Sequence, residues 1–584
     1  MREPKFGSDL IVELLNKLGI EYAAFNPGAT FRGIHDSIVN YGGNKNPEVI
    51  FCCHEEISVA IAHGYAKVAG KPMAAITHDI VGLQHASMAI FNAWCDRVPV
   101  LVLGGTGPMD TTRRRPWIDW VHTALVQGNQ VRDYVKWDDQ PYNLRSVPHS
   151  LIRGYRIAMT EPRAPVYICF DVTIQEEPLV ETVELPNIER FLPPSPVQAN
   201  PQALRQAAQM LVKAKSPIII ADHMGRHPET VPHLIALAEL LSAPVFDRGG
   251  RFNFPNTHPL DLTGGGLDFL EQADVVLALD VQDLQGAFSR LDPQTRSKVY
   301  HISPQAKIIH ISLNDMLVHS WASDYHYLEP QDLPISADTS VALPELLNLI
   351  RQEMEQKSST TKDREERFAR IRETHDNLRR KWREEADRAS SKEKIATSFL
   401  AREIWEVIKN EDWVLVNGTA REWARRLWDW TKPYQYLGGS GGAGLGYGMG
   451  ASIGAALAHR HSGKVCVNIQ ADGDFLMTPS ALWTAAHHKI PLLIVIFNNQ
   501  SFYNSEEHQL RVARFRNRPL ENAPIGTHLS DPTIDYTKLA QGFGIHSEGP
   551  VRKPENLRGA LARALYVVKE KGLPALVDVL CEPR

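Results

Sequence analysis

The chain has 584 residues, which is too many for one hydrophobic core and predicts about three domains. Its 63 basic and 68 acidic side chains give a net charge of −5 spread along the chain, so neither nucleic acid nor an acidic membrane surface is implied as a partner. No apolar run reaches the length that spans a bilayer.

The N-terminal segment and the distribution of the cysteines predict a cytoplasmic location. Residues 1–5 lead into a polar segment and a short amphipathic helix without the apolar region of a secretory signal. The six cysteines are scattered, mostly in apolar strand-like runs, which is typical of reduced structural cysteines.

Strand-like and helical patterns alternate along the chain and predict an α/β fold of three domains, each a mainly parallel sheet with helices on both faces. In the first domain, residues 1–185, helices are expected at 9–18 and 56–69 and strands at 23–25, 49–53, 73–77, 98–104 and 166–171. In the central domain, residues 196–356, helices are expected at 201–214, 229–241 and 341–356 and strands at 217–221, 243–246, 274–280 and 298–302. Residues 357–394 form a charged helical linker, and residues 395–584 form the third domain.

Polar side chains follow two apolar strands of the third domain. Asp472 comes directly after the strand at 465–470, and Asn499 follows the strand at 491–497, with one helical crossover between them. Ligands bind at the carboxyl ends of strands in open parallel sheets, and oxygen ligands of this kind suit Mg²⁺. Gly473 and the following helix N-terminus would let backbone N–H groups approach a phosphate. The alternative interpretation is a tight turn followed by a chance Asn pair.

The run from Asp472-Gly473 to Asn498-Asn499 resembles the thiamine diphosphate motif, with Ala471 in place of the usual first Gly. Its spacing of 27 residues, from 472 to 499, is similar to that of the acetolactate synthase and benzoylformate decarboxylase branch of the thiamine diphosphate-dependent enzymes. This resemblance implies that Asp472 and Asn499 are side-chain ligands of Mg²⁺ and that Ser501 supplies a backbone carbonyl. Gly473 and Asp474 would contact the cofactor.

A second segment carries the same resemblance. Residues 54–66 are similar to the segment that holds the catalytic Glu of the family, and Glu55 is the matching residue. The resemblance implies that Glu55 bonds the cofactor pyrimidine and promotes removal of the thiazolium C2 proton. Glu56 is the competing candidate, but adjacent side chains point differently. On its own, Glu55 would more often be a surface or helix-cap carboxylate.

The glycine-rich run at residues 438–448 allows two interpretations. Its G-x-G fragments resemble a dinucleotide loop, but no acidic residue follows at the expected distance, which disfavours a nicotinamide oxidoreductase. The family resemblance implies instead that Leu445 supports the bent cofactor and that the Ala443 carbonyl accepts from its amino group. The residues Asn417, Gly418 and Thr419 would hold the diphosphate.

The substrate side departs from the familiar patterns. Asn26, Gly28 and Ala29 follow the first strand as in benzoylformate decarboxylase, except that Ala29 replaces a Ser that contacts the substrate carboxylate. His78 matches the catalytic His of that enzyme and could transfer a proton; the alternative is a structural His paired with Asp79. His122 stands where acetolactate synthases carry a Phe and is a weaker catalytic candidate.

The segment after Asn499 is expected to form a helix over the substrate. Phe502 and Tyr503 would face the substrate pocket, whereas Glu506 is expected to be an exposed helical Glu.

Taken over the whole chain, the resemblance implies an enzyme, a thiamine diphosphate-dependent lyase or transferase that breaks or forms C–C bonds next to a carbonyl. Its partners would be a 2-oxo or 2-hydroxy acyl substrate and a second copy of the chain, with the active site between subunits of a homodimer or homotetramer. Alternatives are acetolactate synthase proper, a 2-hydroxyacyl-CoA lyase-like enzyme and a non-catalytic cofactor scaffold. A central-domain FAD or CoA nucleotide is not predicted, because no glycine-rich loop follows the strand at 217–221.

Overall fold

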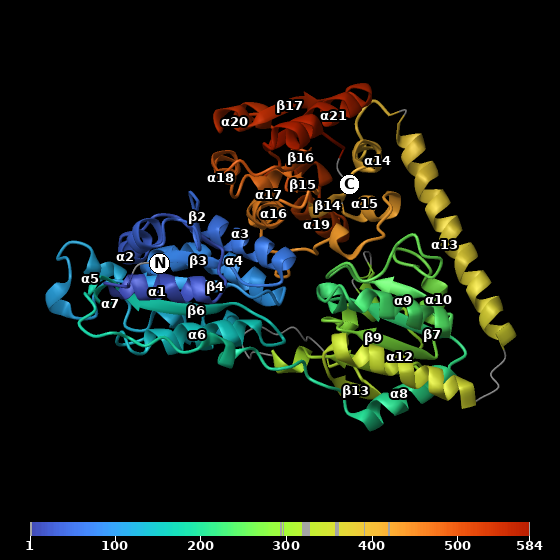
Figure 1. Cartoon of the computed structure of the whole chain (residues 1–584). Coiled ribbons are helices and arrows are strands. Elements are labelled where there is room, and N and C mark those ends of the chain that lie inside the picture. The colour runs from blue at the N-terminus through green and yellow to red at the C-terminus, as the bar shows by residue number, and fades with distance from the viewer. Residues whose placement is uncertain are drawn as a thin grey trace.

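Three sheets of parallel strands, each from a separate stretch of sequence, organise the chain (Figure 1). The computed structural model describes residues 3–292, 295, 297–317, 328–356, 361–390, 392–418 and 421–582. In Figure 1 the N-terminal and central domains lie side by side below the C-terminal domain. Within the described ranges, no helix combines the length and apolarity that crossing a membrane requires.

The N-terminal sheet has the strand order β2-β1-β3-β4-β6-β5, and its pairings are parallel. Its strands are β1 (Tyr22–Phe25), β2 (Glu48–Phe51), β3 (Ala74–His78), β4 (Leu101–Thr106), β5 (Asp138–Asp139) and β6 (Val166–Asp171). The helices around it are α1 (Gly7–Lys17), α2 (Arg32–Asp36), α3 (Glu55–Ala69), α4 (Asp79–Cys95), α5 (Asp119–His122), α6 (Val147–Met159) and α7 (Val172–Glu176). Parallel neighbours need such crossover helices, which place the carboxyl ends of β1 and β3 at one edge.

The central sheet has the order β13-β12-β9-β7-β8. Its strands are β7 (Pro217–Ala221), β8 (Val245–Asp247), β9 (Val275–Leu279), β12 (Lys307–Ser312) and β13 (Leu333–Ser336), and its main helices are α8 (Pro201–Lys213), α9 (Thr230–Leu241) and α12 (Thr339–Gln356). The predicted strand at 298–302 is present as β11 (Lys298–Tyr300), but it pairs antiparallel with β10 (Ser289–Leu291) outside this sheet. All three β11 residues are exposed, so the strand could not have served in a buried parallel sheet.

The C-terminal sheet has the order β14-β15-β16-β18-β17, again all parallel. Its strands are β14 (Trp413–Gly418), β15 (Val465–Ala471), β16 (Leu493–Asn498), β17 (His546–Val551) and β18 (Ala575–Leu580). The helices include α14 (Thr397–Ile408), α15 (Arg421–Leu427), α16 (Tyr447–Ala458), α17 (Asp472–Phe475), α18 (Ala481–His487), α19 (Tyr503–Phe515), α20 (Tyr536–Gly542) and α21 (Pro554–Lys571). The long helix α13 (Thr361–Ala389) runs along the outer side from the central to the C-terminal domain (Figure 1).

Helices α3 and α16 join the N-terminal and C-terminal domains through very close backbone contact. A Cβ atom placed on Gly64 would overlap the Ala451 carbonyl, and one on Gly450 would stand 2.6 Å from the Ala60 Cβ. Only glycine leaves room for helix backbones to approach this closely. The contact brings the first turn of α3 next to the glycine-rich loop that precedes α16.

We expect Gly64→Ala to lower the thermal unfolding midpoint, because the added methyl group overpacks this helix contact at a cost of about 1–3 kcal/mol. Gly559→Ala is the matched control: it lies in helix α21, where a Cβ would meet only the Arg563 Nη1 atom, at 3.3 Å. The control should be neutral or stabilising by up to about 1 kcal/mol, since alanine has the higher helix propensity. Equal midpoints for Gly64→Ala and wild type in differential scanning fluorimetry would contradict the close contact.

Candidate active site

Asp472 and Asn499 lie at the carboxyl ends of two neighbouring strands, as the sequence predicted. Strands β15 and β16 pair in parallel with Ala471 opposite Phe497. Asp472 is the first residue of α17, directly after β15, and Asn499 follows the end of β16. The single crossover between the strands therefore places both side chains at one edge of the sheet.

The Asp472 carboxylate is fully buried and only partly satisfied. Its Oδ1 accepts from the Gly473 N–H at 2.9 Å, while Oδ2 has no hydrogen-bond partner among the described residues. Burial raises the pKa of Asp472 to about 6, although the backbone N–H groups of Gly473, Gln500 and Ser501 act in the opposite direction. A buried carboxylate oxygen without a partner, beside an amide oxygen, is a donor set that fits a small hard cation such as Mg²⁺.

Asn499 and Ser501 close a turn beside Asp472. The Ser501 N–H donates to Asn499 Oδ1 at 3.0 Å, and Gln500 between them has a left-handed φ of 55°. Asp474, one residue beyond Gly473, accepts from the Gly446 N–H at 2.7 Å and from the Gln470 side chain. The turn at residues 472–474 is therefore tied to the glycine-rich loop.

The glycine-rich loop presents its two predicted cofactor contacts at the surface of the site. Leu445 is 45% exposed although it is apolar, and Ala443 has a left-handed φ of 54°, an uncommon conformation for alanine. Asn417, at the end of β14, donates to Asn468 Oδ1 at 2.9 Å, and Gly418 is the last residue of that strand. Thr419 lies outside the described residues.

Glu55 begins helix α3 and is 4% exposed. Its Oε1 accepts from Asn26 Nδ2 at 3.2 Å, and its Oε2 lies 3.2 Å from His85 Nδ1. Glu56, the competing candidate, points elsewhere: a Cβ on Gly446 would stand 2.6 Å from Glu56 Oε1. Burial raises the pKa of Glu56 to about 7, with Asp474 as a further cause. The two adjacent carboxyl groups thus have different surroundings within one chain.

Both predicted histidines lie together, with a buried carboxylate between them. His78 Nε2 and His122 Nδ1 each lie 3.1 Å from Asp79 Oδ2, and the rings are 5.6 Å apart. Burial raises the pKa of Asp79 and lowers that of His78. Gly28 is packed against His78, since a Cβ there would stand 2.6 Å from the His78 Cγ. Ala29 follows Gly28, so the whole loop from Asn26 borders these histidines.

Helix α19 follows the metal-side turn, as predicted, but one expectation about it is wrong. Phe502 packs over Gly473, and Tyr503 begins the helix. Glu506 is 9% exposed rather than solvated: Ser501 Oγ donates to its Oε2 at 2.6 Å, and His528 Nε2 lies 3.1 Å from it. Tertiary contacts from a loop more than 20 residues away bury this carboxylate, which helical periodicity does not show.

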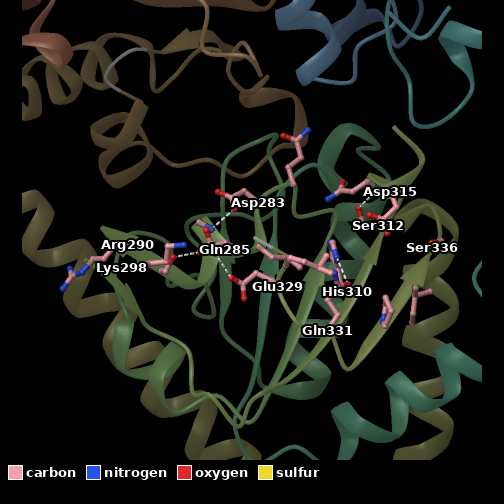
Figure 2. A pocket seen from close by; sticks show the side chains of 18 of the residues that line it. Asp283, Gln285, Arg290, Lys298, His310, Ser312, Asp315, Glu329, Gln331 and Ser336 are labelled. Carbon is pink, nitrogen blue, oxygen red and sulfur yellow. Dashed lines mark hydrogen bonds between the residues drawn. The ribbon is translucent and has the colours of Figure 1, made fainter. Parts of the chain in front are cut away.

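A separate cavity of about 380 Å³ lies in the central domain (Figure 2). It is lined mainly by the segment after β9, the end of β12 and β13, with polar side chains such as Gln285 and Glu329, which hydrogen-bond at 3.1 Å. None of the predicted site residues lines it. An FAD or CoA nucleotide there stays outside our predictions.

These features define a three-domain α/β protein with a buried carboxylate oxygen, unpartnered among the described residues, at the edge of one sheet and a buried acid on a helix beside another. Models of the thiamine pyrophosphate enzyme family match three segments of the chain. The N-terminal TPP binding domain matches residues 6–129, the central domain residues 204–346, and the C-terminal TPP binding domain residues 417–579. The chain belongs to the family of thiamine pyrophosphate-dependent enzymes, and the predicted family and fold are confirmed.

Curated relatives and solved structures agree with this assignment along the whole chain. Acetolactate synthase 1 of Oryza sativa is 25% identical over 603 residues, which cover 99% of this chain and 85% of the relative. The acetolactate synthase large subunit of Haemophilus influenzae is 24% identical, covering 97% and 93%. A thiamine diphosphate-dependent 4-hydroxybenzoylformate decarboxylase from Rhodococcus jostii has the same fold, with a TM-score of 0.76 at 19% identity and 99% coverage of both chains. Over nearly its whole length the chain is thus similar in sequence to acetolactate synthases and shares its fold with this decarboxylase.

Sequence reasoning missed the roles of Asp79 and Asn92. Asp79 appeared only as a partner for a structural His78, whereas the structure places it between two histidines. Asn92 holds the glycine-rich loop from α4: its Oδ1 accepts from the Gly444 N–H at 3.0 Å. The position of Asp79 directly after a candidate His could have indicated its contact with histidine. Nothing in the sequence indicated the contact of Asn92, because its partner Gly444 is 352 residues away.

We expect Asp472→Asn to abolish stabilisation by Mg²⁺ with thiamine diphosphate while making the cofactor-free protein more stable above pH 6. The raised pKa means that the native state holds this proton more tightly than the unfolded chain, so native stability falls as the carboxyl ionises between about pH 4 and 6. Removing the charge recovers up to about 3 kcal/mol at pH 7.5.

Asp578→Asn is the matched control for this prediction. Asp578 is also fully buried, its pKa is raised by burial to about 7, and its Oδ1 accepts from Asn498 at 2.9 Å. This variant should stabilise the cofactor-free protein in the same pH range yet keep the thermal shift on adding Mg²⁺ and thiamine diphosphate. If Asp472→Asn kept the thermal shift on adding Mg²⁺ and thiamine diphosphate, Asp472 would not be a ligand of the metal.

Proposed function

We propose that the protein is a Mg²⁺- and thiamine diphosphate-dependent lyase that cleaves a C–C bond next to the carbonyl of a 2-oxo acid, releasing CO₂. The observation that carries this proposal is the buried Asp472 Oδ2, which has no protein partner in the described chain and lies beside Asn499 at the edge of a parallel sheet. A buried carboxylate oxygen without a protein partner calls for an explanation, and a bound cation at the carboxyl ends of two parallel strands supplies one.

Thiamine diphosphate, when bound, supplies a nucleophilic carbon and an electron sink for carbonyl chemistry. Asp472, Asn499 and the Ser501 carbonyl would hold the Mg²⁺, and Gly473 and Asp474 would line the diphosphate. Asn417, Gly418 and Thr419 would approach the diphosphate from the neighbouring strand, while Leu445 and Ala443 would support the rest of the cofactor. These assignments follow the family motif and agree with the oxygen donors present.

Glu55 is the group that would bond the cofactor pyrimidine. Its burial excludes water, and both of its oxygens face polar side chains, Asn26 and His85. Such contacts fix the orientation of the Glu55 carboxyl group. The role needs this side chain to lie at the domain junction, where the α3–α16 contact places it.

A pair of histidines beside Glu55 favours a decarboxylase or lyase over acetolactate synthase proper. His78 and His122 supply imidazole nitrogens suited to proton transfer near neutral pH. Asn26, Gly28 and Ala29, together with Phe502 and Tyr503, would complete the substrate pocket. Acetolactate synthase proper and a 2-hydroxyacyl-CoA lyase remain the second candidates, and the former is supported by the 25% identical relative.

A second copy of the chain is part of the proposal, as a homodimer or homotetramer with the active site between subunits. Apolar side chains near α5 support it: Trp117, Trp120 and Leu125 are 70–79% exposed close to His122. Within one chain, α3 already packs on α16, so the partner would add to the site formed there. Cytoplasmic location likewise stays an expectation from the sequence.

We expect Glu55→Gln to lower the rate at which the cofactor C2 proton exchanges with deuterium by about 100-fold or more. The matched control is Glu56→Gln, which changes the adjacent carboxyl group and should retain most of the exchange. Exchange followed by NMR needs no knowledge of the substrate. Full exchange in Glu55→Gln, with cofactor bound, would contradict the assigned role and favour a scaffold that only binds the cofactor.

A panel of 2-oxo acids tests the reaction itself. We expect CO₂ release from at least one aromatic or aliphatic 2-oxo acid such as benzoylformate or pyruvate, dependent on Mg²⁺ and thiamine diphosphate, with an aldehyde as the second product. Formation of acetolactate from pyruvate alone would establish the acetolactate synthase alternative instead. Cleavage of a 2-hydroxyacyl-CoA ester with no CO₂ release would favour the CoA lyase.

A further inference from the structure

The buried Asp79 carboxylate has an unusual set of neighbours. Its Oδ1 accepts from the Val81 N–H at 3.0 Å, while its Oδ2 meets His78 Nε2 and His122 Nδ1, each at 3.1 Å. Oδ2 has no hydrogen-bond partner in the described ranges, and Asp79 is 0% exposed. One buried oxygen atom thus lies against two imidazole rings.

Contacts on the far side of His78 fix its tautomer. Its Nδ1 accepts from the Thr30 N–H at 3.3 Å and lies 2.9 Å from Thr30 Oγ1. The same Oγ1 accepts from the Asp79 N–H at 3.1 Å, so its own proton is available for His78 Nδ1. Because Nδ1 is an acceptor, the proton of neutral His78 is on Nε2 and faces Asp79. Both nitrogens of His78 are therefore occupied by the protein.

The same contacts argue against a metal ion among the three side chains. A cation held by His78 Nε2 would require the lone pair on that nitrogen and a proton on Nδ1. That proton would face the Thr30 N–H, which is itself a donor. The arrangement instead suits a carboxylate that lies in close contact with two imidazole rings.

His122 differs from His78 in having one nitrogen uncommitted. Its buried Nδ1 lies 3.1 Å from Asp79 Oδ2 and has no hydrogen-bond partner among the described residues, whereas its Nε2 makes no ion pair with any carboxylate described. The side chain is 23% exposed, at the end of α5. An imidazole held at Nδ1 by a carboxylate and open at Nε2 is arranged for proton transfer.

We infer that His122 Nε2 is the proton-transfer group of this site and that Asp79 is the positioning residue that holds it, with His78 as an anchored neighbour. The inference rests on the proposed function. The bond between the substrate carbonyl carbon and CO₂ breaks, and that carbon then receives the Nε2 proton of His122. His122 afterwards takes a proton from water. On this inference His122 rather than His78 transfers the proton, which is the reverse of the order expected from the sequence.

The charged groups around His122 are few. Asp79 faces it from α4, and His78 faces it from β3. Asp119 lies in the same helix α5, and it accepts a hydrogen bond at 2.7 Å from Arg115, which precedes that helix. Glu55 on α3 acts on His78 rather than directly on His122. Asp79 is the carboxylate in contact with His122.

Acylation by diethyl pyrocarbonate, read by peptide mass spectrometry on the full chain, tests this without a substrate. The reagent attacks unprotonated ring nitrogens, so His122 should be modified and His78 protected between pH 6 and 8, with exposed His461 as the internal reference. In Asp79→Asn, the rate of His122 acylation at pH 7 should change by about threefold or more, because the carboxylate that contacts its Nδ1 is gone.

Two outcomes would overturn the inference. If His78 of the wild-type protein were acylated as fast as His122, the ring nitrogens of His78 would not be protected by their contacts. This outcome would hold whatever the result with Asp79→Asn. An unchanged rate of His122 acylation in a folded Asp79→Asn protein would show that Asp79 does not act on His122.

Turnover provides the second arm, with whichever 2-oxo acid the panel identifies. His122→Gln should lower kcat by about 100-fold or more and remove the limb of the pH profile that depends on this proton, while C2 proton exchange stays at the wild-type rate. His78→Gln should keep that limb. Loss of exchange in His122→Gln would contradict the inference, whereas absence of exchange in the wild type would instead contradict the proposed function.

Discussion

One buried carboxylate, Asp96, holds the three domains in register. Its Oδ2 lies 2.7 Å from His63 Nε2 and 2.6 Å from Lys67 Nζ of α3, and its Oδ1 accepts from Arg251 of the central domain at 2.6 Å. Lys67 also donates to the Tyr447 hydroxyl of the C-terminal domain at 2.9 Å. Burial alone would raise the pKa of Asp96, but Arg251 and Lys67 hold it well below its usual range. Loss of one partner would leave buried charges uncompensated, at a cost of about 3–5 kcal/mol.

The site carboxylates show the opposite balance. Burial raises the pKa of Asp472 to about 6 and that of Glu56 to about 7, and it also raises that of Asp474. Among the described residues, no Lys or Arg side chain forms an ion pair with these three groups, whereas Asp96 pairs with both Lys67 and Arg251. The fold therefore concentrates its own cations at the domain junction and leaves the sheet edge negative. A divalent ion with a phosphate ligand would complete that edge electrostatically.

Local patterns predicted the elements that carry the site better than they predicted its side-chain contacts. Apolar runs that end in polar residues identified β15 and β16, and their crossover implied that Asp472 and Asn499 are neighbours. The burial of Glu506 could not be seen, because its partner His528 comes from a distant loop. Strand β11 was detectable as a strand, but its antiparallel pairing depends on β10, which has no strong periodic pattern.

The position of Glu55 shows why sequence spacing alone could not define the site. Glu55 and Asp472 are 417 residues apart, and two separate constraints bring their segments together. The glycine contacts between α3 and α16 set the distance between the helices, and the Asp96 cluster fixes how far α3 extends toward the glycine-rich loop, where Lys67 also reaches the Gly439 carbonyl. Lys67 lies three turns along α3 from Glu55. A shift of the ion pair between Lys67 and Asp96 would therefore move the Glu55 carboxyl group as well. The chemistry at one end of the helix therefore depends on the charge pairing at the other.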